Sequence, residues 1–214
     1  MKHLIIIGAR GFGREVYNTA LESIGYGVDF DIKGFLDDKL DALDSFEGYP
    51  AIISSVENYT PESNDVFICA LGEVKWKKYY TQMILDKGGD FITLIHKQAS
   101  ISKNVKVGLG SIICNQSIVS CDVNIGKFST IQPHVLIGHD NTIGEYCQIN
   151  SNSTIGGNVN IGDFVTIHTS AVILPKAKIG ELAIVGAGSV VLRSVPTNTT
   201  VFGNPAKKIP LPKV

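Results

Sequence analysis

One histidine stands beside an aspartate in an arrangement suited to proton transfer. His139 and Asp140 follow Ile137 and Gly138 in the second half of this 214-residue chain. A neutral imidazole, with a pKa of about 6.5, can accept a proton from an attacking group at neutral pH. An adjacent carboxylate can orient the ring and stabilise its charged form. We therefore expect His139 to act as a general base with Asp140 as its partner, although an isolated histidine in a turn is more often simply solvent-exposed.

A second set of candidates lies near the N-terminus and suits the binding of a phosphorylated ligand. A turn with three glycines follows the apolar run Leu4–Ile7: Gly8, Gly11 and Gly13. Such a turn lets backbone N–H groups and a helix N-terminus face a pyrophosphate. Asp37 and Asp38 follow the next apolar run and can accept hydrogen bonds from ribose hydroxyls or a uracil N–H. Paired aspartates after a strand are also ordinary turn formers, so this pattern alone leaves both interpretations open.

The composition describes a folded chain and excludes several classes of protein. Hydrophobic residues make up 44% and charged residues 18%, which is too apolar for disorder. The run Leu4–Ile7 is far too short to span a bilayer, so we expect a cytoplasmic protein without a membrane partner. No CxxC spacing occurs among the 4 cysteines, which disfavours a zinc ribbon or a disulfide framework.

The two halves of the chain differ in charge. Residues 1–95 carry 15 acids and 9 bases, whereas residues 96–214 carry 5 acids and 10 bases. This split disfavours a nucleic-acid module and suggests that the second half meets an anionic ligand.

Alternating strand and helix patterns in residues 1–95 predict a small Rossmann-like α/β domain. The expected strands are His3–Ile7, Ile32–Leu36, Val66–Leu71 and Phe91–Ile95. The expected helices are one that follows the glycine turn and one over Glu73–Leu85. Apolar side chains fall on one face of the first helix: Phe12, Val16, Ala20, Leu21 and Ile24.

A six-residue repeat governs residues 96–214. From Ile101 to Val191, every sixth residue is Ile or Val, and the residue four positions later is small or narrow almost throughout, up to Val195. Asn141 is the exception at that second position. Such hexads predict a parallel β-helix in which three hexads close one coil of eighteen residues. We expect the segment Leu192–Val214 to cap one end of it.

Several motifs recur here in a characteristic order. They are Ile5–Gly13, Phe35–Asp38, Leu94–His96, Ile137–Asp140, Gly156–Val159 and Val201–Lys207. In this order they resemble the bacterial sugar acyltransferases that join a small Rossmann-like domain to a left-handed β-helix. The family is typified by sialic acid O-acetyltransferases and UDP-4-amino-sugar N-acetyltransferases. The resemblance covers essentially the whole chain.

The resemblance implies a homotrimer with active sites between subunits and acetyl-CoA as co-substrate. It implies a nucleotide-sugar-binding domain over residues 1–95, in which Gly72 contacts the substrate, and an acyltransferase domain over residues 96–214. His139 would be the base, with Asp140 raising its basicity. Gln148 stands where the family has a second histidine that contacts the acetyl-CoA thioester, and we expect its amide to keep a binding role. The hexad register places Gly157 one coil from His139, where it leaves room for the pantetheine arm.

The leading expectation is acetyl-CoA-dependent N-acetylation of a nucleotide-linked amino sugar in bacterial surface glycan biosynthesis. A sugar hydroxyl as acceptor, as in sialic acid O-acetylation, is the alternative within the same enzyme class. A trimeric binding scaffold without catalysis is a third hypothesis. A carbonic anhydrase-like metalloenzyme is a fourth, because His134 and His139 lie five residues apart. Among the positions stacked on these histidines, only Cys121 offers a further metal ligand, so we expect no metal.

In the glycine turn, Phe12 stands where the resembling family usually has a histidine. Phenylalanine cannot donate the corresponding hydrogen bond, so this departure changes how the turn would contact its ligand.

Overall fold

The computed structural model describes residues 1–209 of the chain. Two compact units are present, one running from Met1 to Lys97 and the other beginning at Gln98. Within residues 1–209, no helix combines the length and the apolar character that crossing a bilayer requires.

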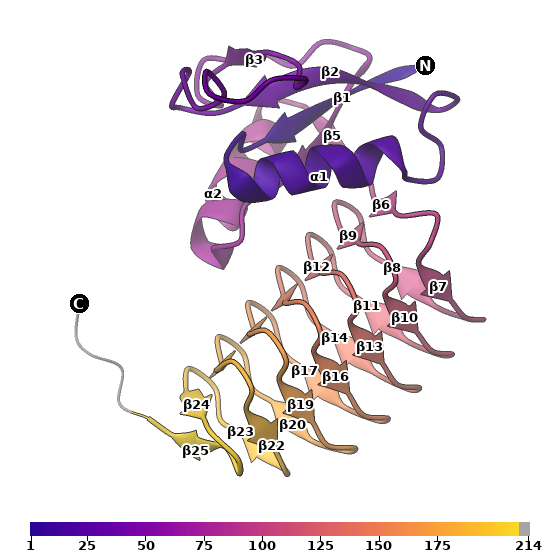
Figure 1. Cartoon of the computed structure of the whole chain (residues 1–214), viewed down its shortest axis with the longest axis vertical. Helices are drawn as coiled ribbons and strands as arrows, with labels where there is room; N and C mark the ends of the chain where they lie inside the picture. The colour runs from indigo at the N-terminus through magenta and orange to yellow at the C-terminus, as the bar shows by residue number, and fades with distance from the viewer. Residues whose placement is uncertain (210–214) are drawn as a thin grey trace. The chain divides into compact units, whose positions relative to one another are not determined.

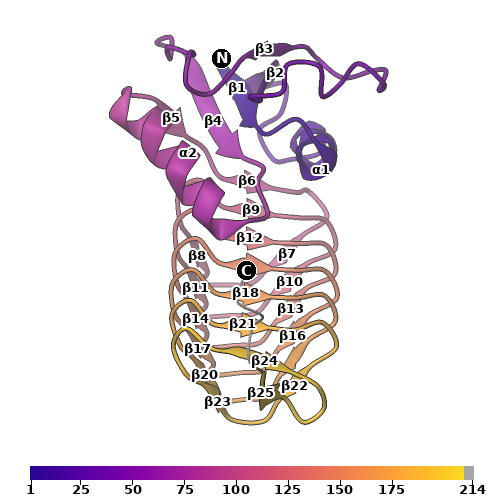
Figure 2. The same cartoon turned by 90° about the vertical axis from the view of Figure 1, so that its left-hand side faces the viewer.

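The first unit is a parallel α/β sheet in the order β3-β2-β1-β4-β5. Its strands are β1 (Lys2–Ile7), β2 (Phe30–Leu36), β3 (Ile52–Ser54), β4 (Asp65–Cys69) and β5 (Asp90–Phe91). Its helices are α1 (Gly11–Leu21) and α2 (Val74–Asp86), which lie on opposite sides of the sheet (Figure 2). Strands covered on both faces are apolar throughout, and the run Leu4–Ile7 in β1 is at most 1% exposed.

Helix α1 is shorter than the apolar pattern predicts. Val16 and Ala20 are fully buried, as expected for the face that packs on the sheet. The expectation that Ile24 extends this face is wrong, because the helix ends at Leu21 and the side chain of Ile24 is 64% exposed. The backbone turns away there because the N–H of Ile24 donates to the carbonyl of Ile95 at 2.9 Å.

The last predicted strand of this unit, Phe91–Ile95, is also wrong as a single element. The structure splits it into β5, which pairs with β4, and β6 (Leu94–Ile95), which is not part of the five-stranded sheet. Residues 95–97 instead bond to the loop after α1, where the N–H of Lys97 donates to the carbonyl of Glu22 at 3.0 Å. The sequence pattern of Phe91–Ile95 predicts one continuous strand, but pairing with distant segments divides it into two.

A cluster of charged and polar groups ties β2 to the start of β4. The Nζ of Lys33 donates to Asp65 Oδ1 and Glu62 Oε2, both at 2.8 Å, and to the hydroxyl of Tyr59 at 2.9 Å. The hydroxyl of Tyr59 donates in turn to Asp65 Oδ2 at 2.6 Å, and the side chain of Asp65 is fully buried. Burial by itself raises the pKa of Asp65, but the hydrogen bonds from Lys33 and Tyr59 outweigh it and lower that pKa.

The second unit is a parallel β-helix whose short strands stack coil upon coil (Figure 1). The first face consists of β7 (Ser100–Ile101), β10 (Ile118–Val119), β13 (Leu136–Ile137), β16 (Thr154–Ile155), β19 (Val172–Ile173) and β22 (Val190–Val191). The second consists of β8 (Lys106–Val107), β11 (Asn124–Ile125), β14 (Thr142–Ile143), β17 (Asn160–Ile161), β20 (Lys178–Ile179) and β23 (Ser194–Val195). The third contains β9 (Ile112–Ile113), β12 (Thr130–Ile131), β15 (Gln148–Ile149), β18 (Thr166–Ile167), β21 (Ile184–Val185), β24 (Thr200–Phe202) and β25 (Lys207–Lys208).

The inward Ile and Val residues form the core of the β-helix, as the hexads predict. Ile137 pairs in register with Val119 before it and Ile155 after it, and all three are fully buried. From Asn104 to Gly188, each turn contains one residue in the left-handed region, such as Asp140 with φ 56°. On another corner Phe128, Tyr146 and Phe164 take up this position and stack at ring distances of 5.0 and 5.3 Å.

The hexad register breaks in the final coil. The repeat places Val195 as a small turn residue, but the structure puts it inward on β23, where it pairs with Ile179. The last turn therefore contains fewer residues than the earlier ones. Beyond it, β25 runs antiparallel to β24 and ends the parallel ladder, as expected of a capped end. The remainder of the predicted cap, with Pro210 and Pro212, lies outside the described residues.

Candidate active site

The glycine turn after β1 is held in place by close backbone packing. Gly8 has a φ of +97°, which side chains of L-residues rarely tolerate. A Cβ on Gly13 would lie 2.0 Å from the carbonyl oxygen of Gly8, so only glycine lets α1 begin this close to β1. The N–H of Ala9 donates to Asp37 Oδ2 at 2.9 Å, which joins the turn to the end of β2.

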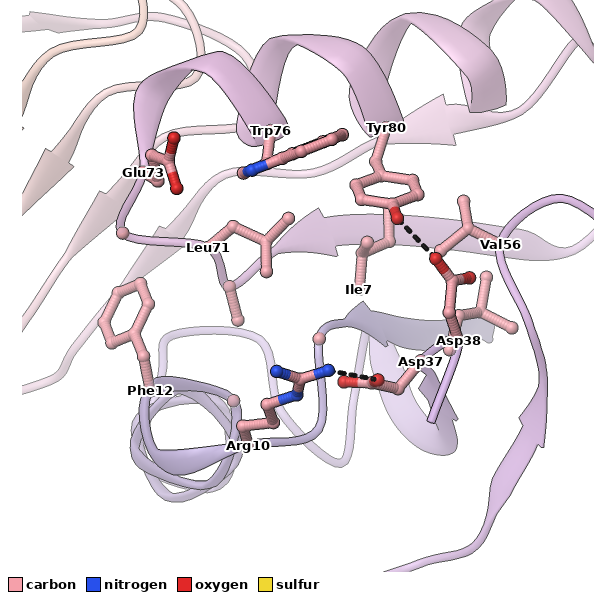
Figure 3. Close-up of a pocket in the computed structure, with 15 residues that line it drawn as sticks. Ile7, Arg10, Phe12, Asp37, Asp38, Val56, Leu71, Glu73, Trp76 and Tyr80 are labelled. Carbon is pink, nitrogen blue, oxygen red and sulfur yellow. Dashed lines mark hydrogen bonds and ion pairs between the residues drawn. The ribbon is translucent and has the colours of Figure 1, made fainter. Parts of the chain in front are cut away.

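A cavity of about 380 Å³ opens beside this turn, at the carboxyl ends of β1, β2 and β4 (Figure 3). In parallel sheets, ligands bind at this end and at the point where the strand order reverses, which here lies between β1 and β4. Five of the six residues predicted to bind substrate line it: Gly8, Gly13, Asp37, Asp38 and Gly72. Gly11, the sixth, is not among the lining residues.

The two aspartates in this cavity differ in what they already bind. Asp37 is 7% exposed, and both of its oxygens accept backbone N–H groups, from Ala9 and from Lys39, each at 2.9 Å. Its carboxylate therefore holds the two turns together, whereas Asp38 accepts from a side chain of α2, as described below.

Arg10 extends a guanidinium to within 3.8 Å of Asp37 at the open side of the cavity, where it can meet a phosphate.

Two aromatic residues of α2 line the cavity and were missed by the sequence reasoning. Trp76 and Tyr80 face Arg10 and Phe12 across it (Figure 3). The Tyr80 hydroxyl donates to Asp38 Oδ2, and this bond together with burial raises the pKa of Tyr80 to about 12. Trp76 remains 43% exposed and offers a flat apolar surface to a ring. The available signal was their spacing of four on a helix that starts just after Gly72.

His139 lies in the turn between β13 and β14 of the β-helix. Its Nδ1 is 2.5 Å from Asp140 Oδ2, and its side chain is 56% exposed. When Nδ1 carries the proton and donates it to Asp140, the lone pair of Nε2 is available to accept another proton. The predicted pair is therefore in contact and accessible to solvent.

Gly157 lies against the ring of His139. A Cβ on Gly157 would be 2.7 Å from His139 Nε2 and 2.8 Å from Cε1. The absence of a side chain at Gly157 thus makes room for the imidazole itself.

Gln148 lies elsewhere on the prism. It belongs to β15 on the third face, whereas the His139 turn joins the first and second faces. Its side chain is 2% exposed, and its Nε2 donates to Asn150 Oδ1 at 3.0 Å. Within one chain, the structure does not bring Gln148 and His139 onto the same face.

The metalloenzyme hypothesis needs a cluster of ligands. Among the described residues, no group of three or more His, Cys, Asp or Glu side chains is placed to hold a metal ion.

Two domain families match the chain. Residues 3–84 match the PglD N-terminal domain, and residues 158–193 match the bacterial transferase hexapeptide of six repeats. The chain therefore carries both of these domain types, a PglD N-terminal domain followed by hexapeptide repeats. The family resemblance and the fold predicted from the motifs are confirmed.

Individual proteins are also similar to this chain. UDP-N-acetylbacillosamine N-acetyltransferase from Bacillus subtilis (strain 168) is 31% identical over 117 residues, 53% of this chain and 51% of the relative. The match thus spans about half the length of this curated relative. WeeI from Acinetobacter baumannii AYE superposes over 98% of this chain and 100% of its own, with a TM-score of 0.87 and 28% identity.

A third relative has been solved with a ligand. The acetyltransferase domain of PglB from Neisseria gonorrhoeae FA1090 has a TM-score of 0.89 and 27% identity, and covers 98% of this chain and 100% of its own. The same domain has been solved in complex with acetyl coenzyme A.

Proposed function

We propose that this chain transfers the acetyl group of acetyl-CoA to the amino group of a nucleotide-linked sugar. The observation that carries the proposal is the accessible imidazole of His139, paired through Nδ1 with Asp140 at 2.5 Å, in a hexapeptide β-helix. The relatives support the choice of reaction, since two of them are named as acetyltransferases and one binds acetyl coenzyme A. We place the reaction in the cytoplasm and in the synthesis of bacterial surface glycans.

His139 serves this reaction as the base. As the amine attacks the thioester carbonyl, the C–N bond forms and a proton passes from nitrogen to His139 Nε2. The C–S bond then breaks, and the CoA thiolate takes up the proton from the imidazolium. Asp140 stabilises the charged ring between these two steps.

The nucleotide portion of the acceptor is assigned to the cavity of the α/β unit. Arg10 and the start of α1 suit a pyrophosphate, and Trp76 offers a surface on which a base or a sugar ring can stack. The B. subtilis relative, whose name specifies a UDP-sugar, supports a nucleotide sugar as ligand. We therefore assign substrate binding to residues 1–95, including Gly72, and acyl transfer to residues 96–214.

A homotrimer with active sites between subunits would bring His139 and Gln148 into one site. His139 and Gln148 lie on different faces of one prism, so a site that uses both side chains needs two copies of the chain. The first face also exposes large apolar side chains suited to contact with another subunit, since Ile118 is 47% and Leu136 is 42% exposed.

The experiment that tests the proposal is a thiol-release assay with acetyl-CoA and a panel of nucleotide sugars. The panel pairs 4-amino sugars with the corresponding 4-hydroxy sugars on UDP, GDP and dTDP carriers. We expect release of CoA with at least one amino sugar and none with its hydroxy counterpart. Release with the hydroxy sugars alone would replace N-acetylation by O-acetylation, and no release with any acceptor would contradict the proposal.

A further inference from the structure

Asn141 departs from the repeat at the turn that carries His139. At the same position of other hexads the chain has small residues, among them Ser129 and Cys147. The side chain of Asn141 is fully buried in the prism. A larger polar residue in such a narrow corner calls for an explanation from its contacts.

The serines at this position make a recurring pair of close hydrogen bonds. The hydroxyl of Ser129 donates to the carbonyl of Gly144 at 2.9 Å and accepts the N–H of Cys147 at 2.9 Å. One bond thus reaches the carbonyl fifteen residues ahead and the other reaches the amide eighteen residues ahead. Together they join one coil to the next.

Asn141 makes this same pair and adds a third bond. Its Nδ2 donates to the carbonyl of Gly156 at 2.9 Å, and its Oδ1 accepts the N–H of Val159 at 2.5 Å. The additional bond runs from Nδ2 to the carbonyl of Gly138 at 2.8 Å, within its own turn. An amide has two N–H donors, whereas the single O–H of Ser129 donates to Gly144 at 2.9 Å and leaves the carbonyl of Lys127, in its own turn, at 3.5 Å.

Both carbonyls belong to peptides that position the imidazole. The carbonyl of Gly138 is part of the peptide bond that leads into His139, so fixing it fixes the direction in which the side chain leaves the backbone. The carbonyl of Gly156 belongs to the peptide that leads into Gly157, against which the ring lies. The two peptides are in close contact, since a Cβ on Gly138 would come within 2.8 Å of the Gly157 nitrogen.

We propose that Asn141 is a positioning residue for His139: its amide group clamps the peptide before the imidazole to the peptide before Gly157. The ring is then held from two sides, by Asp140 at Nδ1 and by the Gly157 backbone beneath Nε2. This inference rests on the proposed function of His139 as the base. It assigns a kinetic role to a buried residue that does not itself touch the substrates.

The test is Asn141→Ser, which supplies the residue that the fold accepts at Ser129 and releases only the bond to Gly138. We expect kcat to fall by about tenfold, because small errors in the position of a base are costly. The KM values for acetyl-CoA and the sugar should stay near those of the wild type, and the melting temperature should fall no further than in the control described next, because only one buried hydrogen bond is lost. The matched control is Ser129→Ala, which removes the bonds of a turn that carries no base and should lower the melting temperature while leaving kcat unchanged.

Asn141→Cys is the second variant, since Cys147 shows that the fold accepts cysteine at this position. It should lower kcat in the same way. An unchanged kcat in either folded variant would overturn the inference. A failure of both variants to fold would also overturn it, because Asn141 would then be required for folding rather than for positioning His139. Loss of the proposed function is distinguishable, because the wild-type chain would then release no CoA with any acceptor.

Discussion

The two units of this molecule place their functional side chains in different ways. In the β-helix, His139 occupies a turn position that recurs every eighteen residues, and its neighbours follow from the register: Asn141 beneath the turn and Gly157 one coil on. In the α/β unit, the cavity is assembled from three separate strand ends and two helices, with no internal repeat. The β-helix is thus suited to holding one group in a fixed position, and the α/β unit to fitting a particular ligand. If this division holds, changes in either unit should affect different measured quantities.

The largest effect on stability is expected for Lys33→Met in the α/β unit. The change leaves the fully buried carboxylate of Asp65 without its cation, which costs about 3 kcal/mol in the unfolding free energy of β2 and β4. Hydrogen exchange should show faster opening of amides in these strands, while amides of β13 and β16 keep their protection. The control, Lys39→Met, removes an exposed pair with Asp41 and should cost less than about 0.5 kcal/mol.

The same cluster gives stability a defined dependence on pH. Because the folded state lowers the pKa of Asp65, its contribution is complete above the unfolded value of about 3.9 and is lost as pH falls through the lower folded value. Wild-type protein should therefore lose protection in β2 and β4 over this acid range. Asp65→Asn should lose the corresponding part of that dependence, and an identical acid profile in both proteins would contradict the assignment.

The next effect is expected for Trp76→Ala, which removes an aromatic wall of the cavity. Ring stacking of this kind contributes about 1.4 kcal/mol, so KM for the nucleotide sugar should rise about tenfold. KM for acetyl-CoA should not change, because the donor is assigned to the other unit. Tyr79→Ala is the control, since Tyr79 contacts Trp76 but does not line the cavity. A rise in the acetyl-CoA KM alone would break the division between the units.

Gln148→Ala is expected to have the smallest effect, on the opposite substrate. One neutral hydrogen bond contributes about 0.5–1.5 kcal/mol. The amide of Gln148 is 2% exposed and must give up Asn150 to reach the thioester, so KM for acetyl-CoA should rise at most about threefold while KM for the sugar stays constant. Gln132→Ala is the control, since Gln132 directly follows β12, the strand that pairs with β15, and no ligand is assigned to it. An unchanged KM for acetyl-CoA in Gln148→Ala would remove the binding role assigned to this residue.

Repetition explains which features could be predicted from the sequence. The inward positions of the β-helix, such as Ile137, follow from a single rule applied in every coil, and Asn141 is visible as a departure from that rule. The rule fails at Val195, where the last turn is shorter and changes the register. The pairing of His139 with Asp140 was expected because the two residues are adjacent in the chain.

The α/β unit was less predictable because its contacts join distant segments. Trp76 and Tyr80 face the cavity only because the strand order brings the start of α2 beside the glycine turn. The apolar run ending at Ile95 reads as one strand, but hydrogen bonds to the loop after α1 divide it. The spacing of Trp76 and Tyr80 places them on one face of α2, but no local pattern shows that this face borders the cavity or that the run ending at Ile95 is divided.

The central claim is that the imidazole of His139 accepts the proton of the attacking amine. The most direct measurement is single-turnover transfer of a labelled acetyl group from acetyl-CoA to the nucleotide amino sugar, by the wild-type chain and by His139→Ala. We expect the rate to fall about a thousandfold in the variant, with acetyl-CoA binding and the melting temperature retained. Transfer by a folded His139→Ala protein at the wild-type rate would contradict the account.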